Sequence, residues 1–304
     1  METIGRALAA RCGDLIEMSL KSHLKTFVPE GLWHFAGFCK RLPTYWRLDR
    51  SENLRVRKGV PGLPLFVSPE VHVQIPETVT AYIYWRAHAF EDADLWAETT
   101  DFLKLAEGCS GLIDIGAQTG FFSALFARAR TAPVSILSME PDAQVQAILA
   151  RARVLNGGDG IDWEIRHEAV SDHEGTIGIP ISNRPYEADL SAGEPGDLIT
   201  VPSRSLTALI ESLDWTPDLL KIDVESFEYE ILTTSVPVIE RLRPALHLEV
   251  HWEILQRRGL DPMDFLAPLA RMGYRGNRSG YRTLEDWAAA GRKEVVSRLS
   301  LKVG

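Results

Sequence analysis

Short apolar runs alternate with amphipathic stretches along this chain from residue 111 onward. The apolar runs predict five strands, at Leu112–Ile115, Val134–Met139, Ile161–Arg166, Leu219–Ile222 and Leu246–Val250. The helical spacing between them predicts four helices, at Thr119–Arg130, Ala143–Leu155, 203–213 and 226–234. Strands separated by helices at this spacing imply right-handed crossovers and an α/β fold with a largely parallel sheet covered on both faces.

The flanking segments continue this pattern less regularly. Ser203 is a plausible N-cap for the helix at 203–213. The insert before it contains two β-like runs, Thr176–Ile181 and Leu198–Val201, which predict a hairpin or flap over the site. Further elements are expected as strands around Leu65–Val67 and Val71–Ile75, a helix over 91–107, a helix near 262–271 and a closing strand near 296–303.

The first 60 residues differ from the rest in charge. They contain 11 Lys and Arg against 6 Asp and Glu, a balance of +5, whereas the whole chain has −9. We therefore divide the chain into a basic, mainly helical extension at 1–60 and a main domain at 61–304. The aromatic and basic stretch 32–60 is interpreted as a cap packed on the main domain. The alternatives are peripheral contact with an anionic membrane, an acidic partner, or a homodimer contact.

The composition excludes several classes of protein. A chain of 304 residues with 45% hydrophobic and 25% charged residues is typical of a soluble globular enzyme. The net charge of −9 argues against a nucleic-acid binder. The three cysteines lack metal-type spacing and favour a reducing cytoplasm, and no apolar run has the length of a membrane span.

The first strand ends in a glycine turn with an unusual acidic position. The spacing is Asp114-x-Gly116-x-x-x-Gly120, not the G-x-G-x-x-G typical of dinucleotide enzymes. A carboxylate before the first glycine would serve a pyrophosphate poorly, but would suit a ligand with an ammonium group. S-adenosylmethionine has an α-ammonium and a sulfonium and no phosphate, so the turn favours this donor over NAD.

The next two strand ends supply candidates for the nucleoside part of such a ligand. Glu140 follows the second strand, where an acid can accept both ribose hydroxyls. Pro141 and Asp142 come next, and Asp142 is alternatively a helix cap. After the third strand, the backbone of Ala169 and the carboxylate of Glu168 are candidates for the base, although this segment is equally consistent with an ordinary polar turn.

Titratable residues cluster after the fourth and fifth strands. Asp223 and Glu225 follow the fourth strand, and Glu249 and His251 lie near the carboxyl end of the fifth. A neutral imidazole can accept the proton of an alcohol nucleophile, so His251 is the candidate general base. Glu228, near a helix start, is expected to cap that helix.

These segments together resemble the motifs of FkbM-family methyltransferases over about residues 90–275. The matching segments, in order, are Asp-Ile-Gly-Ala-Gln-Thr-Gly, Glu-Pro-Asp, Ala-Val-Ser-Asp, Leu-Lys-Ile-Asp-Val-Glu-Ser-Phe-Glu and His-Leu-Glu-Val-His. The resemblance implies a class I methyltransferase Rossmann-like fold with a mostly parallel seven-stranded sheet flanked by helices. It implies S-adenosylmethionine as donor and O-methylation of a hydroxyl on a sugar or natural-product metabolite. Ser226 and Phe227 depart from the family's usual Gly-Ala and are expected to crowd the floor of the site.

The resulting hypothesis assigns two sets of residues. The catalytic set is His251, Glu249, Asp223 and Glu225. The donor-binding set is Asp114, Gly116, Ala117, Gln118, Gly120, Phe121, Glu140, Pro141, Glu168, Ala169 and Asp223. The partner is a small-molecule acceptor, a glycan or a secondary metabolite, with no nucleic acid.

Two alternatives remain open at this point. In one, the chain binds the donor but is an inactive regulatory or partner-binding protein. In the other, Asp223, Glu225, Glu249 and His251 bind a hard divalent ion that acidifies the acceptor hydroxyl, although the principal hypothesis assigns no metal ligand.

Overall fold

The computed structural model describes residues 62–130, 133–180, 198–276 and 296–304, together with Leu284, Asp286 and Ala288. The chain divides into two compact units, Met1–Asn53 and Leu54–Gly304, and every described residue belongs to the second. The predicted extension at 1–60, with its membrane, partner or dimer contact, lies outside the described residues. So does the middle of the insert, residues 181–197.

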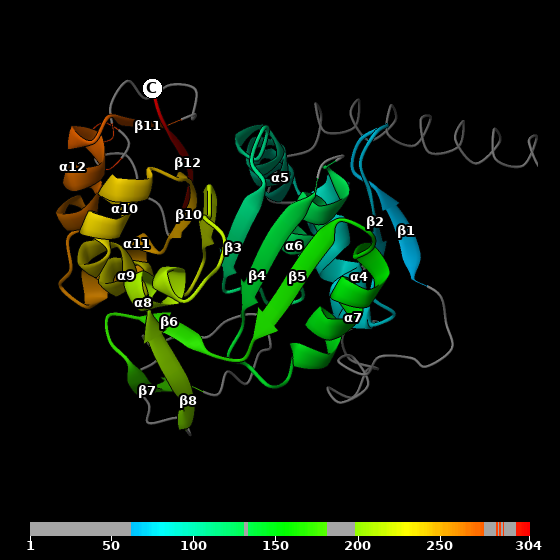
Figure 1. Cartoon of the computed structure of the whole chain (residues 1–304), viewed down its shortest axis with the longest axis horizontal. Helices are drawn as coiled ribbons and strands as arrows, with labels where there is room; N and C mark the ends of the chain where they lie inside the picture. The colour runs from blue at the N-terminus through cyan, green and yellow to red at the C-terminus, as the bar shows by residue number, and fades with distance from the viewer. Residues whose placement is uncertain are drawn as a thin grey trace, which may run out of the picture. The chain divides into compact units, whose positions relative to one another are not determined.

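A seven-stranded sheet forms the centre of the second unit (Figure 1). Its strands are β3 (Gly111–Ile115), β4 (Val134–Met139), β5 (Ile161–Arg166), β9 (Leu219–Ile222), β10 (Ala245–Val250), β11 (Tyr274–Gly276) and β12 (Ser297–Val303). They are ordered β11-β12-β10-β9-β3-β4-β5. The last five of these are parallel neighbours, whereas β12 is antiparallel to both β10 and β11. The predicted mostly parallel seven-stranded α/β fold is therefore confirmed.

Helices cover both faces of this sheet. On one side are α4 (Val79–Arg86), α5 (Ala93–Leu105), α6 (Phe121–Arg128) and α7 (Gln146–Asn156), with a π-helical turn, η1 (Ala87–Glu91), between α4 and α5. On the other are α8 (Leu206–Glu211), α9 (Glu228–Thr234), α10 (Val236–Leu242), α11 (Trp252–Arg257) and α12 (Met263–Arg271). None of the described helices is long and apolar enough to cross a membrane.

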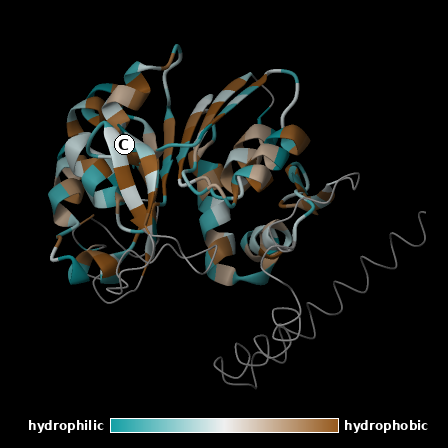
Figure 2. Ribbon diagram, turned by 90° about the horizontal axis from the view of Figure 1, so that it is seen from below, coloured by the Kyte–Doolittle hydropathy of each residue, from teal (hydrophilic) through white to brown (hydrophobic). Residues whose placement is uncertain are grey.

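The strands are apolar along their length because each face of the sheet packs against helices. Leu112 joins the core cluster of α4–α7, whereas its neighbour Ile113 joins the cluster of α8–α12. Figure 2 shows hydrophobic residues running along the strands of the sheet between the two helix layers. Two buried cores thus hold the strand ends in fixed register.

Two smaller sheets accompany the large one. β1 (Leu63–Phe66) and β2 (His72–Ile75) form an antiparallel pair, and β6 (Ala169–Ser171), β8 (Leu198–Ser205) and β7 (Gly175–Pro180) form a three-stranded sheet. The antiparallel pairing of β7 with β8 confirms the hairpin predicted in the insert.

The N-cap predicted at Ser203 is wrong. Ser203 lies within β8, paired with Ala169 of β6 and Gly175 of β7, because the ladder between β8 and β6 continues to Ser205. The side chain of Ser205 instead accepts a hydrogen bond of 3.2 Å from the backbone N–H of Ala208 and caps α8.

Candidate functional site

The glycine turn between β3 and α6 is held by contacts with both neighbouring strands. Gly116 has φ 78°, and a Cβ added to it would lie 1.9 Å from the backbone oxygen of Asp223, just beyond β9. The N–H groups of Gly116 and Ala117 donate to the backbone oxygen of Met139, at 3.0 and 3.1 Å. Gly116 is therefore required because a side chain here would prevent the close approach of the ends of β3 and β9.

Glu140 lies at the carboxyl end of β4 and faces this turn. One carboxylate oxygen accepts from the N–H of Gln118 at 2.7 Å, and the other accepts from the N–H of Asp142 at 2.8 Å. Burial raises the pKa of Glu140 to about 7, although both N–H donors oppose the shift. Each carboxylate oxygen has a second lone pair, so both remain able to accept from a ribose hydroxyl. Pro141, which follows, is partly exposed.

The side chain of Gln118 is also suited to a ligand. Its Oε1 is buried and has no hydrogen-bond partner among the described residues. A buried acceptor without a partner is costly, and a ligand ammonium or hydroxyl would satisfy it. The loop that Gln118 and Glu140 form therefore offers hydrogen-bond acceptors to a ligand.

Asp114 lies beneath the loop and not on its surface. Its side chain is fully buried and accepts a 2.5 Å hydrogen bond from the Ser123 hydroxyl, while Lys221 Nζ lies 3.7 Å away. Ser123 in turn contacts the Ser138 hydroxyl at 2.8 Å, and Trp163 Nε1 donates to the same hydroxyl at 2.8 Å. This geometry favours a supporting role for Asp114 over the direct ammonium contact expected from the sequence.

The remaining donor-site candidates are mostly buried. Ala117 is 6% and Phe121 1% exposed within the core cluster of α4–α7, and a Cβ on Gly120 would lie 2.7 Å from Leu149. Ala169 is 7% exposed in β6, and Glu168 receives a hydrogen bond of 3.1 Å from Arg204 Nε. The contact of Arg204 with Glu168 was not predicted from the sequence, because Arg204 belongs to no recognisable motif.

Three of the predicted catalytic residues meet beyond β9 and β10. Ligand-type atoms of Asp223, Glu225 and His251 lie within 4.8 Å of one another. His251 Nε2 is 3.1 Å from Glu225 Oε2. Asp223 and Glu225 follow β9, and His251 follows β10. The parallel pairing of β9 with β10 therefore brings the three residues together.

Glu228 fixes the ring of His251 from behind. It is fully buried, and its Oε1 accepts from the His251 backbone N–H at 2.9 Å and lies 3.3 Å from His251 Nδ1. Burial lowers the pKa of His251, but Glu228, Glu225 and Asp223 outweigh this and raise it to about 10. His251 is thus protonated at neutral pH. Sequence reasoning treated Glu228 as a helix cap and missed this contact.

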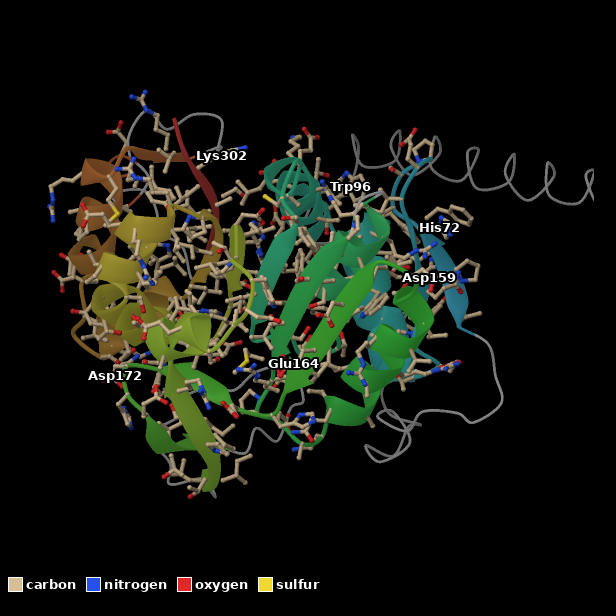
Figure 3. The ribbon with its side chains drawn as sticks, in the orientation of Figure 1. His72, Trp96, Asp159, Glu164, Asp172 and Lys302 are labelled. Atoms are coloured by element: carbon tan, nitrogen blue, oxygen red, sulfur yellow. The ribbon has the colours of Figure 1, made fainter. Side chains whose placement is uncertain are left out.

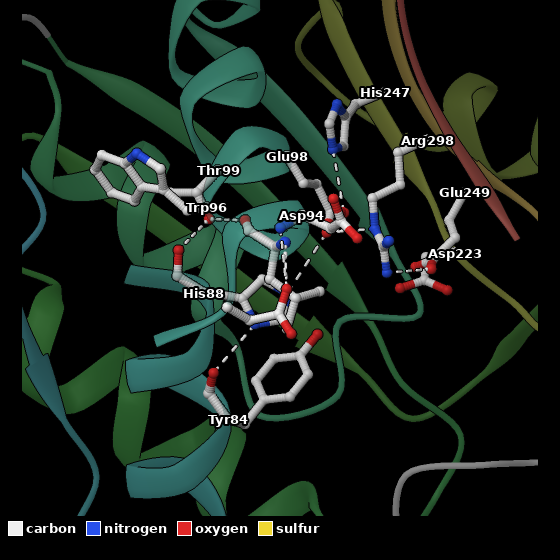
Figure 4. Close-up of polar contacts among 12 residues, drawn as sticks. Tyr84, His88, Asp94, Trp96, Glu98, Thr99, Asp223, His247, Glu249 and Arg298 are labelled. Carbon is white, nitrogen blue, oxygen red and sulfur yellow. Dashed lines mark hydrogen bonds and ion pairs between the residues drawn. The ribbon is translucent and has the colours of Figure 1, made fainter. Parts of the chain in front are cut away.

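Glu249 belongs to a different part of the same edge. Arg298 Nη2 donates to Glu249 Oε1 at 2.6 Å, and Arg298 Nε lies 2.7 Å from Glu98 Oε2 (Figure 4). Glu249 is also hydrogen-bonded to Asp223. Burial, and after it the charges of Asp223 and Glu98, raise the pKa of Glu249 well above its usual range.

A buried ionic network extends from there toward α5. Glu98, 4% exposed, lies 3.4 Å from His247 Nε2 and 3.6 Å from His88 Nε2. Burial opposes the charge of Glu98, but these imidazoles and Arg298 hold its pKa well below the usual range. Neither Glu98 nor Arg298 carried a sequence signal, because each lies far along the chain from Glu249.

Ser226 and Phe227, which were expected to crowd the floor of the site, both contact Arg258. Ser226 has φ 84°, a left-handed conformation in which glycine is favoured, which explains the family's usual residue there. Its backbone oxygen and its hydroxyl both accept from Arg258 Nη1 at 3.0 Å. The Arg258 guanidinium also lies over the Phe227 ring, 5.7 Å from its centroid. Arg258 thus holds both substituted residues.

Several solved structures are similar to parts of this chain. The chain is similar to a methyltransferase FkbM from Methylobacillus flagellatus KT, with 14% identity, TM-score 0.37, and coverage of 63% of this chain and 43% of that chain. It therefore spans less than half the length of that protein. It is also similar to a ribosomal protein L11 methylase from Lactobacillus delbrueckii subsp. bulgaricus, with 12% identity, TM-score 0.38, and coverage of 69% of this chain and 78% of that chain. A third similar structure is a precorrin-6y C5,15-methyltransferase from Geobacter metallireducens GS-15, with 12% identity, TM-score 0.37, and coverage of 69% of this chain and 90% of that chain.

With TM-scores below 0.5, these likenesses do not bear on the activity or acceptor of this chain. Comparison with curated proteins gives no match. The family model of the methyltransferase FkbM domain, however, matches residues 114–276, which is more than half of the chain. Because that match includes the glycine turn, Glu140 and the cluster around His251, the chain belongs to the FkbM methyltransferase family.

Proposed function

We propose that this protein transfers the methyl group of S-adenosylmethionine to a hydroxyl oxygen of a small-molecule acceptor, a sugar or a natural product. The observation that supports this most is the meeting of two features at one edge of the sheet. The Gln118–Glu140 loop follows β3 and β4, and the cluster of Asp223, Glu225 and His251 follows β9 and β10. Ligands of open α/β sheets bind at this carboxyl edge.

On the donor side, the protein's task is to hold a cationic nucleoside. Glu140 accepts from the ribose hydroxyls, while Gln118 Oε1 supplies a further acceptor. Asp114 supports the loop through Ser123. When bound, S-adenosylmethionine supplies an activated methyl group that an oxygen nucleophile takes by in-line displacement, leaving a neutral thioether.

On the acceptor side, the protein must orient the hydroxyl and remove its proton. Asp223, Glu225 and Glu249 are placed to accept hydrogen bonds from hydroxyl groups, and His251 is the proposed base. Its pKa of about 10 means that His251 must lose its own proton before it can accept another. Glu228 keeps the Nε2 atom of the ring directed toward Glu225.

The alternative of a donor-binding but inactive protein was based on the departure at Ser226 and Phe227 and on the basic, aromatic segment 32–60, which lies outside the described residues. Arg258 accommodates the backbone and hydroxyl of Ser226, so the bulkier pair gives no specific support for inactivity. Methylation is therefore the function that we favour.

Calorimetric titration with S-adenosylmethionine, followed by transfer of labelled methyl groups to a panel of hydroxylated acceptors, tests this proposal. His251→Gln is expected to bind the donor normally but to lower the transfer rate by about a hundredfold or more. His173→Gln, which alters an exposed histidine paired with Asp172, is the matched control. A rate for His251→Gln within a few-fold of the parent would refute its role as base. Donor binding with no transfer to any acceptor would favour the inactive alternative.

A further inference from the structure

We propose that Asp223, Glu225 and His251 form a binding site for a divalent cation of the Mn²⁺ or Mg²⁺ type. The proposal deepens the proposed function, on which it rests, by assigning an ion to the acceptor side of that site. Asp223 and Glu225 offer carboxylate oxygens, and His251 offers Nε2. All three ligand atoms lie within 4.8 Å of one another, a spread that one ion with ligand distances of about 2.0–2.3 Å can bridge after small side-chain adjustments.

The second observation is the carboxylate behind the histidine. Imidazoles that bind metals usually donate their other ring nitrogen to a carboxylate, which fixes the tautomer and the ring orientation. Glu228 Oε1 lies 3.3 Å from His251 Nδ1 and also accepts from the His251 backbone N–H. Glu228 is fully buried in α9, so it cannot be serving as a solvated surface charge. Nε2 is therefore the ring atom left facing the carboxylates.

The neighbouring cation leaves room for an ion. Lys221 Nζ contacts Asp223 Oδ2 at 3.3 Å, which leaves the other carboxylate oxygen of Asp223 as the ligand. Lys221 Nζ also lies 3.7 Å from Asp114 Oδ1. Asp114 belongs to β3, which pairs with one edge of β9, whereas His251 follows β10, which pairs with the other edge. The set of two oxygen ligands and one imidazole suits Mn²⁺ better than an all-oxygen site would, and it is compatible with Mg²⁺.

A second group of similar composition is excluded by the same criteria. Glu98 lies close to the imidazoles of His88 and His247, which is a plausible metal-binding set by residue type. Arg298 Nε, however, lies 2.7 Å from Glu98 Oε2 and already supplies a positive charge there. At the cluster around His251, Lys221 Nζ contacts one carboxylate oxygen of Asp223, and both Asp223 and Glu225 are partly exposed. Of these two groups of described residues, the cluster around His251 is the one that combines partly exposed carboxylates with a buried support, Glu228.

A cation at this position would bring positive charge to the place where an acceptor hydroxyl must be bound. It would anchor the hydroxyl oxygen and lower its pKa, so that its proton is lost more readily. On binding the ion, His251 would lose its Nε2 proton and act as a ligand in place of the base proposed above, and the proton of the acceptor hydroxyl would pass to water. The sequence analysis left such an ion open as an alternative with Glu249 as a fourth ligand, whereas the proposed site consists of Asp223, Glu225 and His251.

Direct Mn²⁺ binding to the full-length protein, freed of metal by chelator and without donor, tests the site. We expect saturable binding of one Mn²⁺ per chain by calorimetry, with loss of the free Mn²⁺ signal in electron paramagnetic resonance. Glu225→Gln and Asp223→Asn should weaken binding by more than tenfold, and Glu228→Gln by about tenfold. Asp172→Asn is the matched control, because Asp172 contacts His173 at 2.6 Å beside the three-stranded sheet (Figure 3). It should bind Mn²⁺ as the parent does.

The same preparations are titrated with S-adenosylmethionine, which separates the two proposals. Retained donor binding in Glu225→Gln shows that the variant is folded, so its loss of Mn²⁺ supports the site. Absence of saturable Mn²⁺ binding to the parent, or equal binding by Glu225→Gln, overturns the metal proposal and leaves the methyl-transfer proposal standing. Failure of the parent to bind the donor would count against the proposed function alone.

Discussion

The two halves of the proposed site, one for the donor and one for the acceptor, are built in different ways. The donor half, around Gly116 and Glu140, consists mainly of backbone groups and short-range contacts, such as the 2.7 Å bond between Gln118 N–H and Glu140. The acceptor half consists of charged side chains that reach it from distant segments, including Glu98 on α5 and Arg298 on β12. The donor half depends on the close approach of the backbone at Gly116 and Asp223, whereas the acceptor half depends on the pairing of buried carboxylates with Arg298.

This difference predicts different responses to substitution. A shape change in the donor half should displace strand ends, whereas removal of one charge in the acceptor half should leave its partner buried and uncompensated. Three experiments probe this contrast.

The largest effect is expected for Gly116→Ala. The new Cβ would lie 1.9 Å from the Asp223 oxygen and would also occupy a left-handed conformation, so β3 and β9 must separate. We expect a loss of unfolding free energy of about 4 kcal/mol or more, measured by chemical denaturation. Gly108→Ala is the matched control, since Gly108 has φ 81° with no atom within 4 Å of the added Cβ. It should cost about 1–2 kcal/mol from conformation alone. Equal losses in the two variants would contradict the steric explanation.

A smaller loss is expected for Arg298→Met. This change leaves Glu98 and Glu249 without the guanidinium that both contact, and Glu98 is almost fully buried. We expect about 3 kcal/mol of destabilisation.

The control for that experiment is Arg257→Met, which breaks an exposed ion pair with Glu253 at 3.5 Å. Exposed pairs contribute about 0–1 kcal/mol, so this variant should unfold almost as the parent does. Similar destabilisation in both variants would show that Arg298 stabilises the fold only as a surface residue.

The smallest effect concerns the pH dependence of donor affinity. Burial raises the pKa of Glu140 to about 7, so the carboxylate is mostly ionised at pH 8 and mostly protonated at pH 6. The ionised form accepts ribose hydroxyls better, and the dissociation constant should rise a few-fold as the pH falls from 8 to 6. Calorimetry on Glu140→Gln supplies the control, because the donor's own titration remains while that of Glu140 is removed. A parent and variant with the same pH slope would refute the assignment.

Much of the fold and part of the site could be predicted from the sequence. The strands from Leu112 to Val250 have regular apolar runs, and the β7–β8 hairpin has two β-like runs, so local patterns were sufficient. The positions of Asp223, Glu225 and His251 at one edge of the sheet were predicted because each lies within three residues of the end of a strand. Parallel strands place such residues at one edge.

The sequence by itself determined the order of strands and helices, the polar residues at the strand ends and the resemblance to the FkbM family. The tertiary structure alone decided which of those residues face a ligand and which support others. Asp114 is buried against Ser123, Glu228 fixes the His251 ring, and Arg298 joins Glu249 to Glu98. The physical reason is that burial and pairing set the charge of a carboxyl or an imidazole, and its partners here come from segments up to 200 residues apart (Glu98 and Arg298).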